Sequence, residues 1–176
     1  MDLNSRPVAP HPDEALPELP TFTLKSNTVG AKQAMPAAQT APGGSISPHL
    51  SWSGFPEQTQ SFFIYCFDPD APTPAGYWHW GIVDIPAEIT ELEEGAGASD
   101  LHLEGAAFHL LNDAGQASYY GANPPKGDRE HRYVFTVYAL DTPTLGLDEE
   151  TTITTASFNA LFHALAKASL TLTFKQ

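Results

Sequence analysis

The apolar residues of this chain occur in short runs separated by turn residues, which predicts a mainly β protein. The strongest runs are 61–67 (SFFIYCF), 78–85 (WHWGIVDI) and 132–140 (RYVFTVYAL). Continuous aromatic and β-branched runs of this length are typical of strands buried on both faces. Weaker strands are predicted at 21–24 and 107–111. Frequent turn residues between the runs favour an antiparallel β-sandwich or barrel.

One helix is predicted near the C-terminus, over residues 157–168. Four apolar side chains recur there at helical spacing and share one face: Phe158, Leu161, Phe162 and Leu165. Thr155 or Ser157 is suited to cap the first turn. The alternating segment 170–174 (LTLTF) then returns as a strand.

Residues 1–20 contain five prolines, which fix the backbone and remove hydrogen-bond donors. We expect a flexible N-terminal arm that contacts the body near Leu16 and Leu19. Residues 25–49 have the composition of a loop with one strand inside it. A single domain over 21–176 follows from these boundaries and from the length of 176 residues.

Composition and charge narrow the function. The net charge of −13 argues against nonspecific binding to nucleic acid or anionic membranes, because both carry negative charge. The single cysteine, Cys66, excludes an intramolecular disulfide. The sequence contains neither an apolar run of about 18 residues nor the charged and apolar start of a signal peptide, so a cytoplasmic protein is expected.

The segment 68–72 (DPDAP) follows a predicted strand and is the first candidate for chemistry. Its two prolines enforce a rigid path, which holds Asp68 in fixed geometry at the end of the strand. Asp side chains in such loops commonly bond nearby backbone N–H groups. On the residues alone, this turn interpretation is favoured over a functional one.

His79 is the second candidate, inside the predicted strand. Alternation would place it on one face with Gly81 and Val83, and Gly81 would leave open space beside it. Trp78 and Trp80 would point the other way. A buried histidine needs hydrogen-bond partners, and a structural core histidine is favoured here over a ligand-binding one.

The third candidate is the stiff loop 119–127 (YYGANPPKG) with the strand that follows it. His131 and Tyr133 are two positions apart, so their side chains reach the same face. Phe135 and Val137 continue that face into the core. Polar groups above an apolar wall are typical of a small ligand pocket, but a Tyr–His hydrogen bond at a sheet rim explains the pattern equally well.

Other chemistries have less support in the sequence. Asp68, His79 and His131 lack the short spacing of compact zinc motifs, so no metal is predicted. A nucleophile elbow, a phosphate-binding glycine loop and a dinucleotide fingerprint are absent, so neither a catalytic residue nor a cofactor is predicted. Cys66 lies in an apolar run and is expected to be an inert core residue.

Taken together, DPDAP, WHW and GANPPKGDREHRYVF resemble the phosphatidylethanolamine-binding protein family, and most closely its bacterial, Raf-kinase-inhibitor-like branch. The likeness extends to 47–52 (SPHLSW) and 112–115 (NDAG), and covers about residues 21–175. Any one of these motifs is weak, whereas all of them in order are specific.

This resemblance implies an antiparallel β-sandwich with a large central sheet, a smaller sheet and a C-terminal α-helix. It also implies a pocket for phosphate, acetate or phospho-head-groups. The residues it assigns to that pocket are Asp68, His79, Tyr119, Asn123, Pro124, His131 and Tyr133. The family commonly has Gly or Cys at the position of Asn123, and the amide found here is expected to narrow the range of ligands.

Three functions follow as hypotheses. The leading one is a protein that binds a small phosphorylated or carboxylate ligand and regulates a kinase or serine protease by binding. A hydrolase-type enzyme would use the same pocket for acid–base chemistry. An interaction protein with a vestigial pocket would dock through exposed Tyr77 and Tyr120. We expect no nucleic-acid partner and no stable membrane association, and a homodimer by base rate.

Overall fold

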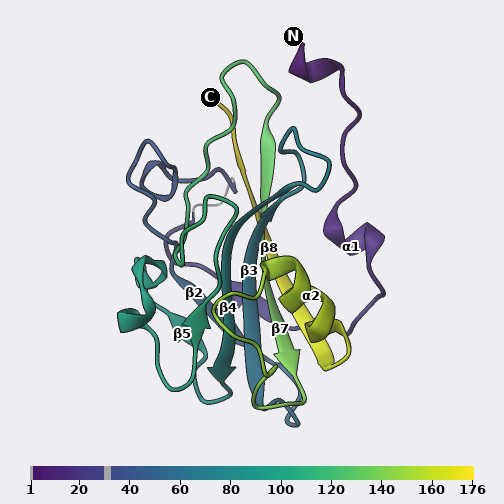
Figure 1. Cartoon of the computed structure of the whole chain (residues 1–176), viewed down its shortest axis with the longest axis vertical. Helices are drawn as coiled ribbons and strands as arrows, with labels where there is room; N and C mark the ends of the chain where they lie inside the picture. The colour runs from purple at the N-terminus through teal and green to yellow at the C-terminus, as the bar shows by residue number, and fades with distance from the viewer. Residues whose placement is uncertain (1, 30–32) are drawn as a thin grey trace.

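The computed structural model describes residues 2–29 and 33–176, and it is built from two antiparallel sheets and one longer helix (Figure 1). Met1 of the arm and residues 30–32 of the predicted loop lie outside the described residues. The smaller sheet has the order β1 (Thr23–Lys25), β2 (Leu50–Ser53), β5 (Glu91–Leu92). The larger sheet has the order β6 (Phe108–His109), β4 (Tyr77–Pro86), β3 (Ser61–Asp68), β7 (His131–Leu140), β8 (Ala164–Phe174). The predicted sandwich is confirmed, and so are its main strands.

The larger sheet is buried on both faces, which explains the continuous apolar runs in its central strands. One face packs against the smaller sheet through side chains that include Trp52, Phe62, Ile64, Trp80 and Phe135. The other face packs against α2 (Ile153–Leu161) through side chains that include Phe63, Tyr65, Val83, Tyr138 and Ile153. Adjacent residues of β3 thus serve different cores, as the alternation of a strand requires.

The predicted helix is displaced. It begins at Ile153, where the Thr152 hydroxyl caps it by accepting a bond from the Thr155 N–H at 3.1 Å, and it ends at Leu161. The residues that it buries are Ile153, Ala156 and Ala160. Phe158 and Phe162, which we expected to share the apolar face with Leu161 and Leu165, are 62% and 71% exposed.

The reason for the displacement is strand pairing. From Ala164 onward the chain pairs with β7 along its whole length, so backbone hydrogen bonds between strands replace those of a continued helix. The predicted strand 170–174 is therefore only the end of the long strand β8. Small alanines on the buried side of α2 allow the helix to lie close to the sheet.

The N-terminal arm lies along the body and contains a short 3-10 turn (Leu3–Ser5) and a one-turn helix, α1 (Pro12–Ala15) (Figure 1). The arm is attached to β8, because the Lys167 ammonium donates to the Asp13 carboxylate at 2.5 Å. The expected contact of Leu19 with the body is confirmed, since Leu19 packs against the core under α2. Within the described residues, no helix has the length and apolar character needed to cross a bilayer.

Candidate functional site

A β-bulge sets the direction of His79. Trp80 pairs with Cys66 and Trp78 pairs with Phe67, so His79 is an extra residue opposite β3. Trp80 therefore enters the core between the sheets while Trp78 packs on the opposite face. His79 lies on the side of Trp80, with its ring centroid 5.1 Å from that of Tyr133. Our expectation that both tryptophans share one face was wrong.

Gly81 does not open space beside His79, as we had expected. It faces α2, and a Cβ atom there would come within 2.7 Å of the Ile153 Cγ1. The glycine thus allows the helix to approach the sheet. The space next to His79 comes from the bulge and from the loops around it.

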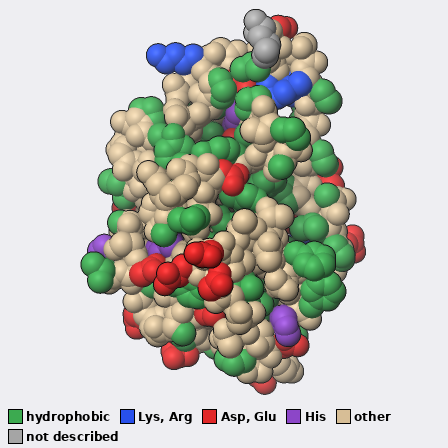
Figure 2. Space-filling view, in the orientation of Figure 1, with side chains coloured by type: hydrophobic (Ala, Val, Ile, Leu, Met, Phe, Trp, Pro, Cys, Tyr) green, Lys and Arg blue, Asp and Glu red, His purple; other side chains and the backbone are tan. Residues whose placement is uncertain are grey.

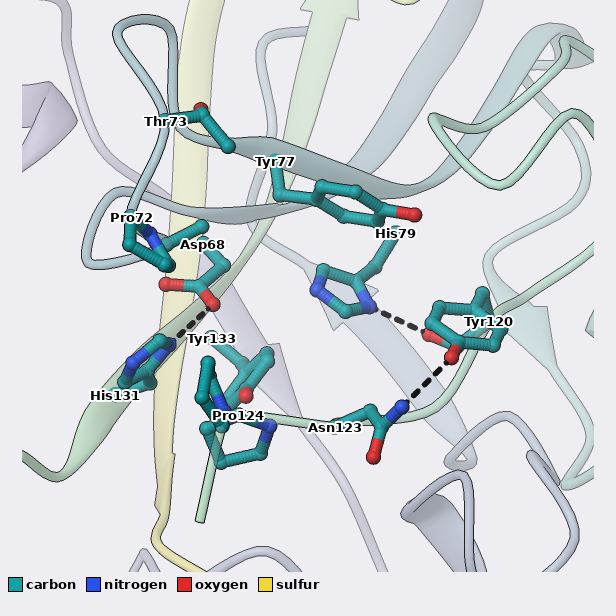
Figure 3. Close-up of a pocket in the computed structure, with 12 residues that line it drawn as sticks. Asp68, Pro72, Thr73, Tyr77, His79, Tyr120, Asn123, Pro124, His131 and Tyr133 are labelled. Carbon is teal, nitrogen blue, oxygen red and sulfur yellow. Dashed lines mark hydrogen bonds and ion pairs between the residues drawn. The ribbon is translucent and has the colours of Figure 1, made fainter. Parts of the chain in front are cut away.

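A cavity of about 250 Å³ lies where the ends of β3, β4 and β7 meet the loops 69–76 and 119–127 (Figure 3). Six of the seven residues predicted for the pocket line it: Asp68, His79, Asn123, Pro124, His131 and Tyr133. They come from positions far apart in the chain, and the fold brings them together.

Tyr119 is the exception. It is buried in the core, where its hydroxyl donates to the Gln39 carbonyl at 2.8 Å, and Tyr120 lines the cavity instead. Neighbouring residues of an extended segment point in opposite directions, so only one of the two tyrosines can face the cavity. Tyr77 also lines the cavity, so the two tyrosines expected on the outer surface belong to its wall. Tyr77 stands two residues before His79, a spacing that could have predicted its position.

The two carboxylate oxygens of Asp68 have different partners. One carboxylate oxygen, Oδ1, accepts a hydrogen bond from the Asp70 N–H at 2.8 Å, which makes the expected turn. The other, Oδ2, lies 2.7 Å from Nδ1 of His131 (Figure 3). The Asp70 carboxylate in turn accepts bonds from the Arg132 guanidinium at 2.7 and 2.8 Å, which fastens the loop to β7.

His131 is held between two buried carboxylates. Its Nε2 lies 3.0 Å from Oδ2 of Asp128, a residue that our sequence analysis did not single out although it stands three positions before the histidine. Burial disfavours the charged ring, but the hydrogen bonds to Asp68 and Asp128 outweigh it, and the pKa of His131 is raised. As an imidazolium, His131 donates to both acids. Neither ring nitrogen of His131 remains free to donate to a ligand.

His79 is in the opposite state. Burial lowers its pKa, and its Nδ1 lies 2.7 Å from the Tyr120 carbonyl oxygen. A neutral ring with the proton on Nδ1 donates to that carbonyl and leaves the Nε2 lone pair free. Nε2 points into the cavity, and none of the described residues forms a hydrogen bond with it (Figure 3).

Tyr133 supplies the second uncommitted group. Its hydroxyl is buried beside the cavity and has no hydrogen-bond partner among the described residues. Burial raises the pKa of Tyr133, so the phenol keeps its proton and is a donor. The cavity thus combines a buried hydroxyl without a partner among the described residues, an imidazole nitrogen with a free lone pair, and an Asp–His pair. Within residues 2–29 and 33–176, no group of three or more His, Cys, Asp or Glu side chains is arranged to hold a metal ion.

Comparison with known proteins identifies the family of this chain. Residues 25–175 match the family model described as phosphatidylethanolamine-binding protein. The UPF0098 protein YbhB of Escherichia coli is 44% identical over 132 residues, which cover 75% of this chain and 83% of YbhB. The UPF0098 protein YbcL of the same organism is 43% identical over 130 residues, which cover 73% of this chain and 71% of YbcL.

Solved structures agree with this match. The crystal structure of E. coli YbcL, described as a member of the mammalian PEBP family, superimposes with a TM-score of 0.84 at 37% identity, covering 88% of this chain and 98% of that one. A PEBP homologue from Chlamydia trachomatis, CT736, gives a TM-score of 0.76 at 29% identity, covering 89% of this chain and 98% of that one. With the motifs and the fold in agreement, this chain belongs to the phosphatidylethanolamine-binding protein family.

Proposed function

We propose that this protein binds a small anion of phosphate or carboxylate chemistry in the cavity beside His79 and Tyr133. The observation that carries the proposal is the Tyr133 hydroxyl, which is buried and has no protein partner in the described part of the chain. A buried donor without a partner costs about 1–3 kcal/mol. An oxygen of a bound anion would accept its hydrogen bond and recover that free energy.

The protonation state of His79 defines which anion fits. The neutral imidazole presents a lone pair at Nε2, and a lone pair repels an oxygen that carries no proton. Binding therefore requires a proton between Nε2 and the ligand, contributed either by a phosphate that is still monoprotonated or by His79 itself. The charged His131 ring offsets the Asp68 carboxylate, which would otherwise repel the anion.

Proton uptake is the expected result when phosphate binds and His79 contributes this proton, because the ring must first gain it from solution. Because the pKa of free His79 is lowered, an anion next to Nε2 raises that pKa, and part of a proton is taken up from solution near pH 7. Isothermal titration calorimetry with inorganic phosphate, in two buffers of different ionisation heat, measures this uptake. Affinity is expected to rise as the pH is lowered from 8 to 6.

Sulfate and a histidine variant serve as controls. Sulfate has the shape of phosphate but carries no proton near neutral pH. The affinity of the protein for sulfate should therefore fall more steeply with rising pH than its affinity for phosphate. His79→Asn removes the imidazole and should abolish the proton uptake that depends on it. The proposal would be wrong if wild-type protein showed no phosphate binding at millimolar concentrations, or released protons on binding it.

A further inference from the structure

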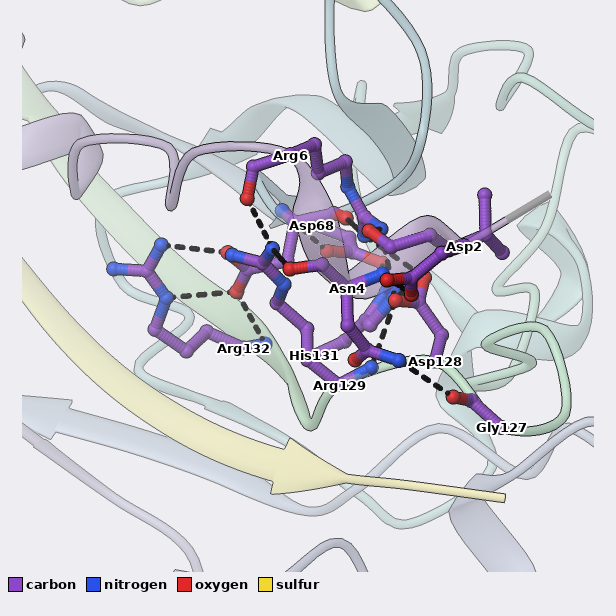
Figure 4. A network of polar contacts seen from close by, with 11 residues as sticks. Asp2, Asn4, Arg6, Asp68, Gly127, Asp128, Arg129, His131 and Arg132 are labelled. Carbon is purple, nitrogen blue, oxygen red and sulfur yellow. Dashed lines mark hydrogen bonds and ion pairs between the residues drawn. The ribbon is translucent and has the colours of Figure 1, made fainter.

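The N-terminal arm reaches the acids behind the cavity. The Arg6 guanidinium donates two parallel hydrogen bonds to the Asp128 carboxylate, Nη1 to Oδ1 and Nη2 to Oδ2, both at 2.8 Å (Figure 4). Asp128 is fully buried, and Arg6 lies mostly beneath the surface. Such a two-pronged pair fixes orientation as well as charge. The hydrogen bond from Arg6 is the main cause that lowers the pKa of Asp128.

This pair continues into the proposed binding site. Asp128 bonds His131, which bonds Asp68, and Asp68 lines the cavity (Figure 4). A chain of hydrogen-bonded charges therefore connects Arg6 with the cavity. In Figure 2, the Lys and Arg side chains visible on this face lie at the end of the molecule where the N-terminus is, whereas acidic side chains gather lower down.

The charges of this network balance only when Arg6 is present. The groups that face one another are three carboxylates, Asp68, Asp70 and Asp128, and three cations, Arg6, Arg132 and the His131 ring. Arg132 is already paired with Asp70. Without Arg6, the single charge of His131 would be shared between two buried carboxylates, and the cavity would become more negative.

The arm also supports the cavity wall from behind. A second cavity, of about 280 Å³, lies between the arm and the loop 69–73, and Ala71 and Thr73 line both cavities. Arg6 donates to the Asp70 carbonyl in the same loop. The contacts of the arm thus fix the loop that carries one side of the proposed site.

We propose that the N-terminal arm is a part of the binding site, in which Arg6 is a positioning residue that neutralises Asp128 and so reserves the charge of His131 for Asp68 and a bound anion. This inference rests on the proposed function. Arg6 lies outside residues 25–175, the segment that matches the family model, so the contribution comes from a part of the chain that the match does not include.

The test compares two variants that lose the same charge. Arg6→Gln removes one partner of Asp128, whereas Arg129→Gln removes a neighbouring guanidinium whose hydrogen bonds, among the described residues, go only to the carbonyls of Asn4 and Arg6. We expect the affinity for inorganic phosphate to fall about tenfold in Arg6→Gln and less than about twofold in Arg129→Gln. Arg6→Lys, which keeps the charge without the second hydrogen bond, should lie between Arg6→Gln and wild type.

A second measurement distinguishes a positioning role of Arg6 from simple attachment of the arm. It follows the ring nitrogens of His131 by NMR during a pH titration without ligand. The charged and titratable groups around this ring are Arg6, Asp68, Asp70, Asp128, Arg132 and His79. Loss of the nearby positive charge should raise the pKa of His131 in Arg6→Gln. Arg129→Gln, which only loosens the arm, should leave it close to the wild-type value.

The outcomes distinguish the two proposals. If wild-type protein fails to bind phosphate, the proposed function fails, while the titration of His131 still decides whether Arg6 controls this ring. If His131 titrates alike in both variants, the positioning role is wrong. Equal phosphate affinity in Arg6→Gln and Arg129→Gln would overturn it as well.

Discussion

Replacing Tyr133 by Phe is expected to weaken phosphate binding and, at the same time, to leave the protein as stable as wild type or more stable. A hydrogen bond to a charged ligand contributes about 1.5–3 kcal/mol, so the affinity should fall roughly 10- to 100-fold. In the free protein the same hydroxyl is buried with no partner among the described residues, and its removal relieves an unsatisfied group. The free energy of unfolding should therefore be unchanged or rise by up to about 1 kcal/mol.

Tyr119→Phe is the matched control, with the reverse outcome. The Tyr119 hydroxyl donates to the Gln39 carbonyl in the core, so its loss should lower the free energy of unfolding by about 1 kcal/mol. Phosphate affinity should not change, because Tyr119 does not line the cavity. Urea denaturation and calorimetry measure the two effects. Wild-type affinity in Tyr133→Phe would contradict the role given to this hydroxyl.

Asp128→Asn is expected to lower the free energy of unfolding by about 3 kcal/mol. Removing one partner of a buried ion pair leaves the other charges without compensation, and such changes cost about 3–5 kcal/mol. The lower end applies here because the Arg6 side chain is 24% exposed and can be partly hydrated. Two positive groups, Arg6 and His131, lose the negatively charged carboxylate that they share.

Glu130→Gln removes the same charge two residues away on an exposed side chain, and its effect should stay within about 0.5 kcal/mol. The pH dependence provides a second check. Because the folded-state pKa of Asp128 is lowered, its stabilisation is present above the ordinary carboxyl pKa and is lost as the pH falls through the lowered value. Wild type and Asp128→Asn should thus converge in acid. Equal stability of Asp128→Asn and Glu130→Gln at neutral pH would contradict the stabilising role given to the buried network.

The sequence predicted the central strands well, because segments such as 61–67 and 132–140 are apolar on both faces and few other structures accommodate such runs. The direction of His79 was not predictable in the same way. A bulge is defined by how a strand pairs with its neighbour, and that pairing register is set only in the folded sheet. Strand alternation along β4 alone gave the wrong face for His79 and Trp78, the residues on the far side of the bulge from Gly81.

The candidate site was predicted in part, for a similar reason. The motif residues Asp68, His79 and His131 mark the cavity because each lies at a strand end or in a buried strand. Arg6 and Asp128 are 122 positions apart, and neither belongs to a motif that indicates their contact. The helix was misplaced because pairing of β8 with β7 outweighs the helical spacing of the apolar residues. Contacts between distant segments decide these features.

Observing the imidazole nitrogens of His79 and His131 by NMR during a phosphate titration tests the central claim most directly. The structure predicts that Nε2 of His79 changes from a lone-pair nitrogen to a protonated or hydrogen-bonded one as phosphate binds, and that both nitrogens of His131 keep the signature of an imidazolium. A His79 ring that is unchanged at saturating phosphate would contradict the proposed binding mode.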